Sequence, residues 1–237
     1  MAFQSGVHHL ALNTANMKEQ IEFFTDVLGA ELQALYWMHG TNGYRHCFLK
    51  LNDDSYMSFV QGPMQEEAAK TTPTAKKLPP APGAMGHVAF SVSSMDEMYA
   101  MRDRIRDSGI VVLGPIDHGF CHSMYFSGPE GLSLEIACNT EQDIDARAWI
   151  DPECVAVHDI SPEELDRYKN PRAYQGKGGK VSNPAVKPGE SVAMFSGDVA
   201  AKVLKMSEAE LTKLMGGSDA PVKVTPRPRR KTAQAAE

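Results

Sequence analysis

The nine residues HLALNTANM, 9–17, recur 78 positions later as HVAFSVSSM, 87–95. Each copy has a histidine, an apolar residue, an alanine, a second apolar residue, four mostly polar positions and a methionine. Similarity at a fixed offset indicates a duplicated supersecondary unit. The segments that follow each copy therefore decide the fold.

An amphipathic helix is predicted after each copy. Apolar residues recur at helical spacing after the cap candidate Asn16, and Gly29 can end that helix. The same pattern runs from Ser94 to Gly109. Three extended segments follow each helix: AELQALYWM, YRHCFLKL and DSYMSFVQ in the first copy, and IVVLGPI, SMYFS and LSLEIAC in the second. Each copy is thus predicted to be βαβββ, and the two should pack together because neither can bury both faces of its sheet alone.

Alternate residues of a strand face opposite sides of the sheet. In HHLALN, Leu10 and Leu12 lie on the face that belongs against the helix, so His9 points to the other, polar side. The same alternation directs His87 and Glu135 to the polar side of their strands. Three separate strands therefore aim two imidazoles and one carboxylate at sides where a cavity can form.

Two histidines and one carboxylate form the facial set that holds Fe(II) and leaves coordination positions open. Any one of these histidines alone is more often a satisfied, partly buried side chain, and a lone glutamate at a strand end is usually exposed. Their joint placement at matching repeat positions favours a metal site formed by His9, His87 and Glu135. Mn(II) accepts the same ligands. His8 is expected to be structural.

The predicted fold class is α+β, with two tandem βαβββ modules forming a curved mixed sheet around a metal site, plus a C-terminal arm. SPEELDRYK and SEAELTKLM look like short capped helices of that arm. The expected boundaries are 1–61 for module 1, 62–84 for a linker or loop, 85–140 for module 2, 141–215 for the arm and 216–237 for a disordered basic tail.

The composition restricts the class of partner. The net charge is −6, and residues 221–231 carry five basic side chains and no acid, so the remainder carries −11. An acidic body disfavours nucleic acid as the main ligand. The absence of a long apolar run disfavours a membrane span. With no evident signal peptide and four cysteines without CxxC spacing, a cytoplasmic location is expected.

These residues resemble the vicinal oxygen chelate superfamily, which includes glyoxalase I, bleomycin-binding proteins, fosfomycin thiol transferases and type I extradiol dioxygenases. The resemblance covers about residues 6–140, through the H-x-A strands and the segment YFSGPEGLSLE. It implies two βαβββ modules whose curved sheets enclose a divalent metal.

A fourth metal position in this superfamily lies on the last strand of module 1. Superposing DDSYMSFVQ on PEGLSLEIA puts Phe59 opposite Glu135, and phenylalanine cannot bind a metal. Glyoxalase I typically has a glutamate there, so the resemblance disfavours that activity. A three-ligand set resembles the extradiol dioxygenases and also the fosfomycin enzymes, which are typically much shorter.

The segment IDHGFCHSMYFSGPEGLSLE, 116–135, resembles the extradiol dioxygenase signature, from which Gly128 departs. By this resemblance, His118 and Tyr125 would hydrogen-bond the substrate oxygens. The turn and strand of this segment are common to the whole superfamily, so only His118 favours the dioxygenases.

Ring-cleaving relatives also place an acid–base histidine near the start of the last strand of module 1, where this chain has Ser55, Tyr56 and Met57. His46, one strand earlier, can substitute for it or can simply pack beside Cys47.

The resemblance implies an Fe(II) ring-cleavage dioxygenase with a small aromatic diol and O2 as substrates. The long C-terminal arm suggests contacts with a second copy, so a homo-oligomer is expected. The alternatives are a metal-dependent lyase, isomerase or epimerase that stabilises an enolate, and a metal-free small-molecule binding protein. The other aromatic candidates are either walls of the site or ordinary core and surface residues: Tyr36, Trp37, Phe120, His39 and His122.

Overall fold

The computed structural model describes residues 6–63, 83–142, 144–187, 189–193, 195, 197–216 and 220–223. The chain divides into two compact units, one formed by Met1–Leu35 with Arg45–Val181 and the other by Tyr36–Tyr44 with Ser182–Glu237. Most of the expected linker, 62–84, and of the expected basic tail, 216–237, lies outside the described residues.

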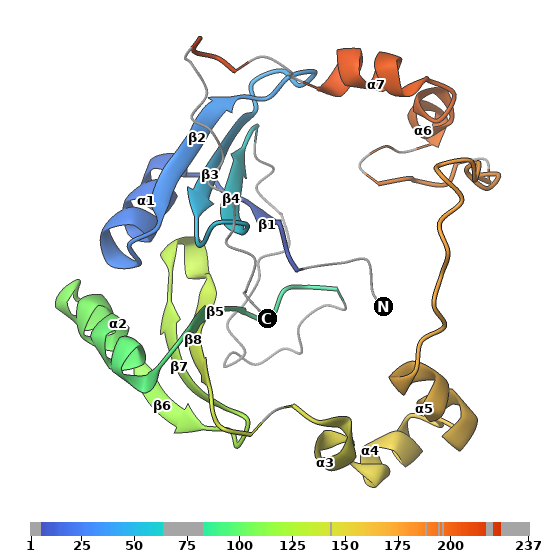
Figure 1. Ribbon diagram of the computed structural model, residues 1–237. Helices are drawn as coiled ribbons and strands as arrows, with labels where there is room; N and C mark the ends of the chain where they lie inside the picture. Colours follow the sequence, from blue (N-terminus) through green and yellow to red (C-terminus); the bar gives the residue numbers. More distant parts are fainter. Residues whose placement is uncertain are drawn as a thin grey trace, which may run out of the picture. The chain divides into compact units, whose positions relative to one another are not determined.

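The first module has the predicted βαβββ order, and its helix covers one face of a four-stranded sheet (Figure 1). The sheet order is β1-β4-β3-β2, with β1 parallel to β4. Asn16 caps the helix by accepting a hydrogen bond from the backbone of Glu19, and the helix continues into a π-helical turn, Phe23–Val27. The elements are β1 His9–Asn13, α1 Met17–Glu22, β2 Glu31–Trp37, β3 Arg45–Lys50 and β4 Tyr56–Gln61.

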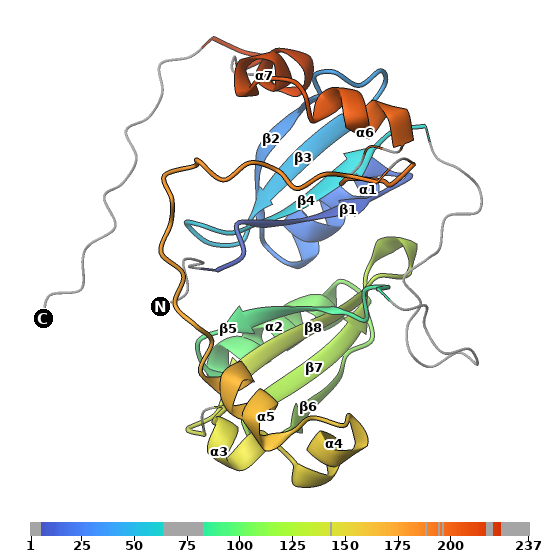
Figure 2. The same ribbon diagram turned by 90° about the vertical axis from the view of Figure 1, so that its right-hand side faces the viewer.

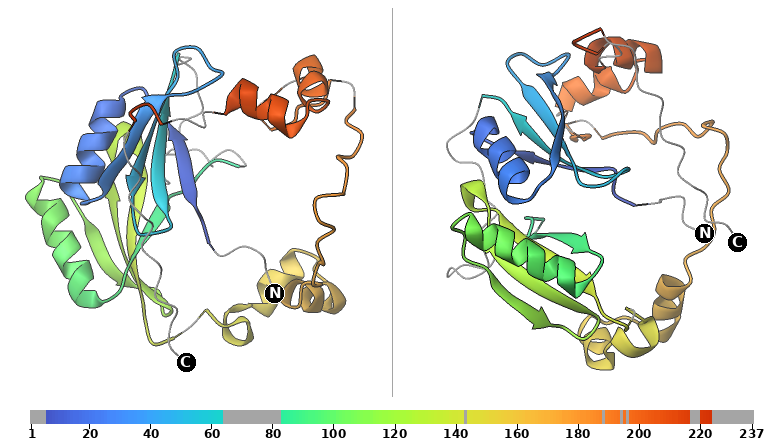
Figure 3. Two further views of the ribbon diagram at one scale, coloured as in Figure 1. Left: turned by 45° about the horizontal axis from the view of Figure 1, so that its top comes forward. Right: turned by 60° about the vertical axis from the view of Figure 1, so that its left-hand side comes forward.

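The second module repeats this topology, with the sheet order β5-β8-β7-β6 and β5 parallel to β8 (Figure 2). Ser94 caps its helix, which lies across one face of the sheet (Figure 3). The α+β class and the duplication are therefore confirmed. The elements are β5 Val88–Val92, α2 Met95–Asp107, β6 Leu113–Asp117, β7 Cys121–Ser127 and β8 Ser133–Asn139.

Short helices follow β8. Three of them belong to the first unit: α3 Ala146–Trp149, α4 Pro152–Val157 and α5 Pro162–Lys169. Two belong to the second unit: α6 Gly197–Val203 and α7 Glu208–Met215. The predicted helices α5 and α7 are confirmed, each with a capping box. The other three were not predicted, because they have only four to seven residues and little apolar periodicity. No helix of the described residues is long and apolar enough to cross a bilayer.

A continuous apolar core lies under the helix-facing side of both sheets. Phe24, which is completely buried, packs edge-on against Phe59 of module 1 and against Phe90 of module 2, with ring centroids 5.2 Å and 6.1 Å away. Burying large aromatic side chains is a main source of folding free energy. Phe24 therefore joins the cores of the two modules.

The modules are also joined by one carboxylate. Glu130, in the turn before β8, accepts hydrogen bonds from Thr14 Oγ1 at 2.7 Å, the Ala15 amide at 2.7 Å and Gln20 Nε2 at 2.9 Å. Burial alone would raise the pKa of the Glu130 carboxyl. The hydrogen bonds outweigh that effect and hold the pKa below its ordinary value of 4.5.

Substituting Phe24 by alanine should lower the free energy of unfolding by about 3–5 kcal/mol, because the change leaves a cavity between two modules. Urea unfolding measures the loss. The control is Val111→Ala at an 86% exposed position, which should change stability by less than about 0.5 kcal/mol. Equal effects of the two substitutions would contradict the description of Phe24 as the shared core residue.

The contribution of Glu130 to stability should depend on pH. Because its pKa is lower in the folded than in the unfolded protein, its contribution is complete above the unfolded-state value and is lost as the pH falls through the folded-state value. The difference in unfolding free energy between wild type and Glu130→Gln should therefore be largest near neutral pH and shrink between about pH 5 and pH 3. A difference that stays constant over this range would show that the charge of Glu130 is not what stabilises the contact.

Candidate functional site

The strand register corrects one prediction. Ala11 pairs with Ser58 across β1 and β4, and Ala89 pairs with Glu135 across β5 and β8. Since Ala11 and Ala89 are equivalent in the repeat, the residue equivalent to Glu135 is Ser58. The superposition that chose Phe59 was wrong by one residue, because it aligned these strands at an offset of 76, whereas the register gives an offset of 77. A shift of one residue exchanges the two faces of a strand.

Phe59 accordingly lies on the core face and is completely buried. Ser58 lies on the opposite face, where its hydroxyl donates a hydrogen bond to the carbonyl of Leu10 at 3.2 Å. The fourth position therefore lacks a carboxylate, although the residue there is serine and not phenylalanine.

His87 and Glu135 lie together on the face of the second sheet opposite α2. The distance between His87 Nε2 and Glu135 Oε2 is 2.9 Å. Glu135 is only 6% exposed, whereas about half of the His87 side chain is exposed. A buried carboxylate needs a cation or hydrogen-bond donors to compensate for its lost hydration, and the imidazole supplies one such partner.

Tyr125 and His118 extend this group. Tyr125 is paired with Glu135 across β7 and β8, and its ring lies edge-on to that of His87, with the centroids 6.2 Å apart. His118 follows β6, and its Nε2 lies 3.1 Å from the Tyr125 hydroxyl. Module 2 thus places two imidazoles, a phenol and a carboxylate on one side of one sheet.

Module 1 places other histidines on the equivalent face of its sheet. His9 points away from the core, as the alternation predicted, and its Nδ1 lies 2.9 Å from His8 Nδ1. The rings of His9 and His46 both contact Phe48, at 5.3 Å and 4.5 Å between centroids. Burial lowers the pKa of the His46 imidazole, and the neighbouring His9 lowers it further.

The structure therefore brings His87 to Glu135 and places His9 beside His8. Among the residues that the structure describes, no three histidine, cysteine, aspartate or glutamate side chains lie close enough to hold a metal ion. The three-residue ligand set of His9, His87 and Glu135 stays a prediction.

The remaining candidates have more ordinary surroundings. Phe120 packs against Trp149 of α3, with ring centroids 4.9 Å apart. His39 and Trp37 are exposed, and His122 Nδ1 lies 4.0 Å from a carboxylate oxygen of Asp117.

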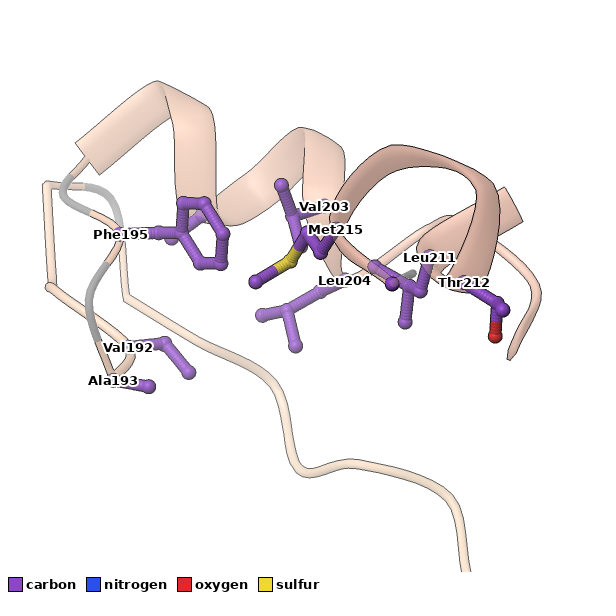
Figure 4. A pocket seen from close by; sticks show the side chains of 10 residues that line it. Val192, Ala193, Phe195, Val203, Leu204, Leu211, Thr212 and Met215 are labelled. Carbon is purple, nitrogen blue, oxygen red and sulfur yellow. The ribbon is translucent and has the colours of Figure 1, made fainter. Parts of the chain in front are cut away.

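The second unit contains a cavity of about 460 Å³ between α6, α7 and the segment before α6 (Figure 4). Its walls are almost entirely apolar, with Phe195, Leu204 and Met215 among the larger side chains. None of the residues that line it is titratable, so it offers no acid–base or metal chemistry.

The protein-family model described as Glyoxalase/Bleomycin resistance protein/Dioxygenase superfamily matches residues 6–136. The chain belongs to this superfamily. The match spans both βαβββ modules, and it confirms the family to which the repeated H-x-A strands pointed.

Two curated members of the superfamily illustrate its range. "Biphenyl-2,3-diol 1,2-dioxygenase 3" from Rhodococcus globerulus is 25% identical over 128 residues, which cover 54% of this chain and 60% of that protein. "Probable lactoylglutathione lyase" from Vibrio cholerae is 25% identical over 138 residues, covering 56% of this chain and 90% of that protein. The match thus spans less than two thirds of the dioxygenase. A solved glyoxylase/bleomycin resistance protein/dioxygenase domain from Frankia sp. EAN1pec is 15% identical, covers 58% of this chain and 99% of its own, and has a TM-score of 0.48.

Proposed function

We propose that this protein is a metal-dependent oxidoreductase, an Fe(II) ring-cleavage dioxygenase of the extradiol type that acts on a catechol-like aromatic diol. The observation that carries the proposal is the group in module 2, where the His118–Tyr125 hydrogen bond lies beside the His87–Glu135 pair. The similarity to the Rhodococcus globerulus protein supports the substrate class.

The chemistry of the donors fits Fe(II) or Mn(II). His87 and Glu135 offer an imidazole nitrogen and a carboxylate oxygen 2.9 Å apart, and both ligand types suit these metals. We assign the third position to His9, the repeat equivalent of His87, whose ring lies on the corresponding face of module 1. When bound, such a metal supplies Lewis acidity to the oxygens of the substrate.

The neighbouring residues of the chain handle protons and orientation. If the Nε2–H of His118 donates the 3.1 Å hydrogen bond to the Tyr125 hydroxyl oxygen, the Tyr125 O–H stays available for the substrate, and the unprotonated Nδ1 of His118 can accept a proton from a diol hydroxyl. Tyr125 is suited to donate its O–H to a substrate oxygen that gains negative charge. Burial lowers the pKa of the His46 imidazole and so favours its neutral form, in which it can act as a second base from module 1.

A lyase or isomerase that uses the same metal is the second candidate. The observation that favours it is the match to the Vibrio cholerae protein, which covers 90% of that protein. Ser58 counts against this candidate, because it offers no carboxylate at the position equivalent to Glu135.

Substituting the ligands tests the metal site. His87→Ala and His9→Ala should each lose most of the bound metal after anaerobic purification, because two remaining ligands hold Fe(II) or Mn(II) weakly. His8→Ala is the matched control and should retain it. Elemental analysis measures the metal content, and retention by His9→Ala with loss by His8→Ala would mean that the two neighbours have been assigned the wrong way round.

Oxygen consumption tests the reaction. The iron-loaded protein should consume O2 in the presence of a catechol, and His118→Ala or Tyr125→Phe should lower kcat by about 10²- to 10⁴-fold. His122→Ala, on the same hairpin, should have little effect. Turnover of a dicarbonyl–thiol adduct without oxygen consumption would replace the dioxygenase with the lyase.

A further inference from the structure

The two halves of the proposed site belong to different modules. His9 extends from β1 of module 1, whereas Glu135 lies on β8 of module 2. Their separation therefore depends on what fixes β1 relative to β8. Glu130 is the residue of module 2 that hydrogen-bonds the end of β1, through Thr14 and Ala15.

Glu130 itself is exposed, but two of its three donors are buried. The Thr14 and Gln20 side chains, which donate to Glu130, are each only 1% exposed. Buried polar groups of this kind are nearly always hydrogen-bonded, so their presence requires an acceptor at this point. Glu130 has a backbone φ of +55°, a left-handed conformation that non-glycine residues rarely adopt. Glycine adopts this conformation most easily. A glutamate at this position therefore accepts a backbone conformation that is unfavourable for it, and in exchange it provides a carboxylate that glycine lacks.

The duplication shows that the contact is not a general property of the fold. With the repeat offset of 78, the positions equivalent to Thr14 and Gln20 are Val92 and Met98, which have no hydroxyl or amide to donate. The position five residues before Ser58, equivalent to Glu130, is Asp53. Its carboxylate binds Lys50 of its own hairpin at 2.7 Å. Because Val92 and Met98 cannot donate a side-chain hydrogen bond, the second copy cannot form the Thr14 and Gln20 contacts that Glu130 accepts.

The two ends of the contact lie the same distance in sequence from the proposed ligands. Thr14 is five residues after His9, and Glu130 is five residues before Glu135. The first connection runs along β1, and the second runs from the turn Pro129–Gly131 into β8, which begins at Ser133. Strands are stiff elements, because ladder hydrogen bonds hold them to their neighbours. A metal site needs its ligands placed to within about 0.5 Å.

We infer that Glu130 is a positioning residue of the metal site, which holds His9 of module 1 in register with His87 and Glu135 of module 2. The inference rests on the proposed ligand set. It assigns to the turn GPEG a role beyond reversing the chain, namely to fix the separation between the two half-sites.

Two variants break the contact from opposite sides. Glu130→Gln removes the negative charge of the carboxylate whose oxygens accept three hydrogen bonds. The double variant Thr14→Val/Gln20→Met instead gives module 1 the residues that module 2 has at the equivalent positions, and so keeps an apolar core. The matched control is Asp53→Asn, which removes the charge of the equivalent carboxylate. Hydrogen exchange of the Ala15 amide reports whether the contact has opened, without any metal.

The functional readout is the Mn(II) affinity, measured from the electron paramagnetic resonance signal of free Mn(II). Glu130→Gln and the double variant should each weaken binding roughly tenfold, the lower end of what supporting residues contribute to metal affinity. Asp53→Asn should bind Mn(II) like wild type. In a His9→Ala background, Glu130→Gln should weaken binding no further, because the remaining ligands both belong to module 2.

Three results would overturn the inference. One is wild-type Mn(II) affinity in Glu130→Gln although the Ala15 amide has lost its protection. Another is an equal loss of affinity in the presence and absence of His9, which would indicate a general effect on folding. If His9→Ala alone leaves the Mn(II) affinity unchanged, the ligand set itself is refuted, and the exchange of the Ala15 amide shows separately whether Glu130 joins the modules.

Discussion

The alternation of side chains along the strands is the constraint on which the rest of the structure depends. Phe59, Leu134 and their neighbours are buried because one face of each sheet is covered by a helix and a shared apolar core. Once that face is fixed, the intervening residues must project from the opposite one. Glu135 and His9 occupy the opposite face, where the site is proposed, because the apolar residues beside them occupy the core.

The fold was largely predictable for the same reason. The repeated HLALNTANM and HVAFSVSSM segments, together with their helix caps, indicated two βαβββ modules, and the observed sheet orders are identical in both. The short helices α3, α4 and α6 were missed, because segments of four to seven residues carry too little periodicity to distinguish a helix from a loop.

The site was predictable only within each module. Alternation placed His9, His87 and Glu135 on the side away from the core, where the structure also has them, and the pairing of β7 with β8 brings Tyr125 to Glu135. The equivalence of residues in the last strands of the two modules was not predictable, because it depends on the lengths of the loops before them. Superposing the two turn-and-strand segments at an offset of 76 chose Phe59, whereas the register has an offset of 77 and places Ser58 there, since the sequence alone does not fix where the segments differ in length.

The sequence predicted that the modules pack together, but it did not predict the polar contacts between them. The turn GPEG looked like a common chain reversal, and the buried amide of Gln20 lies within an otherwise apolar helix face. A comparison of the two copies could have indicated this contact, because Thr14 and Gln20 occupy the positions where the second copy has valine and methionine. A polar residue that breaks the pattern of its own repeat requires a partner elsewhere, and here that partner is Glu130.

The central claim is that a single metal ion is shared by the two modules. Pulsed electron paramagnetic resonance of the Mn(II)-loaded protein counts the imidazoles bound to the metal directly. The account predicts two imidazole nitrogens in the wild type and one after His9→Ala. Two imidazoles that persist without His9, or a wild-type spectrum with a single imidazole, would contradict it.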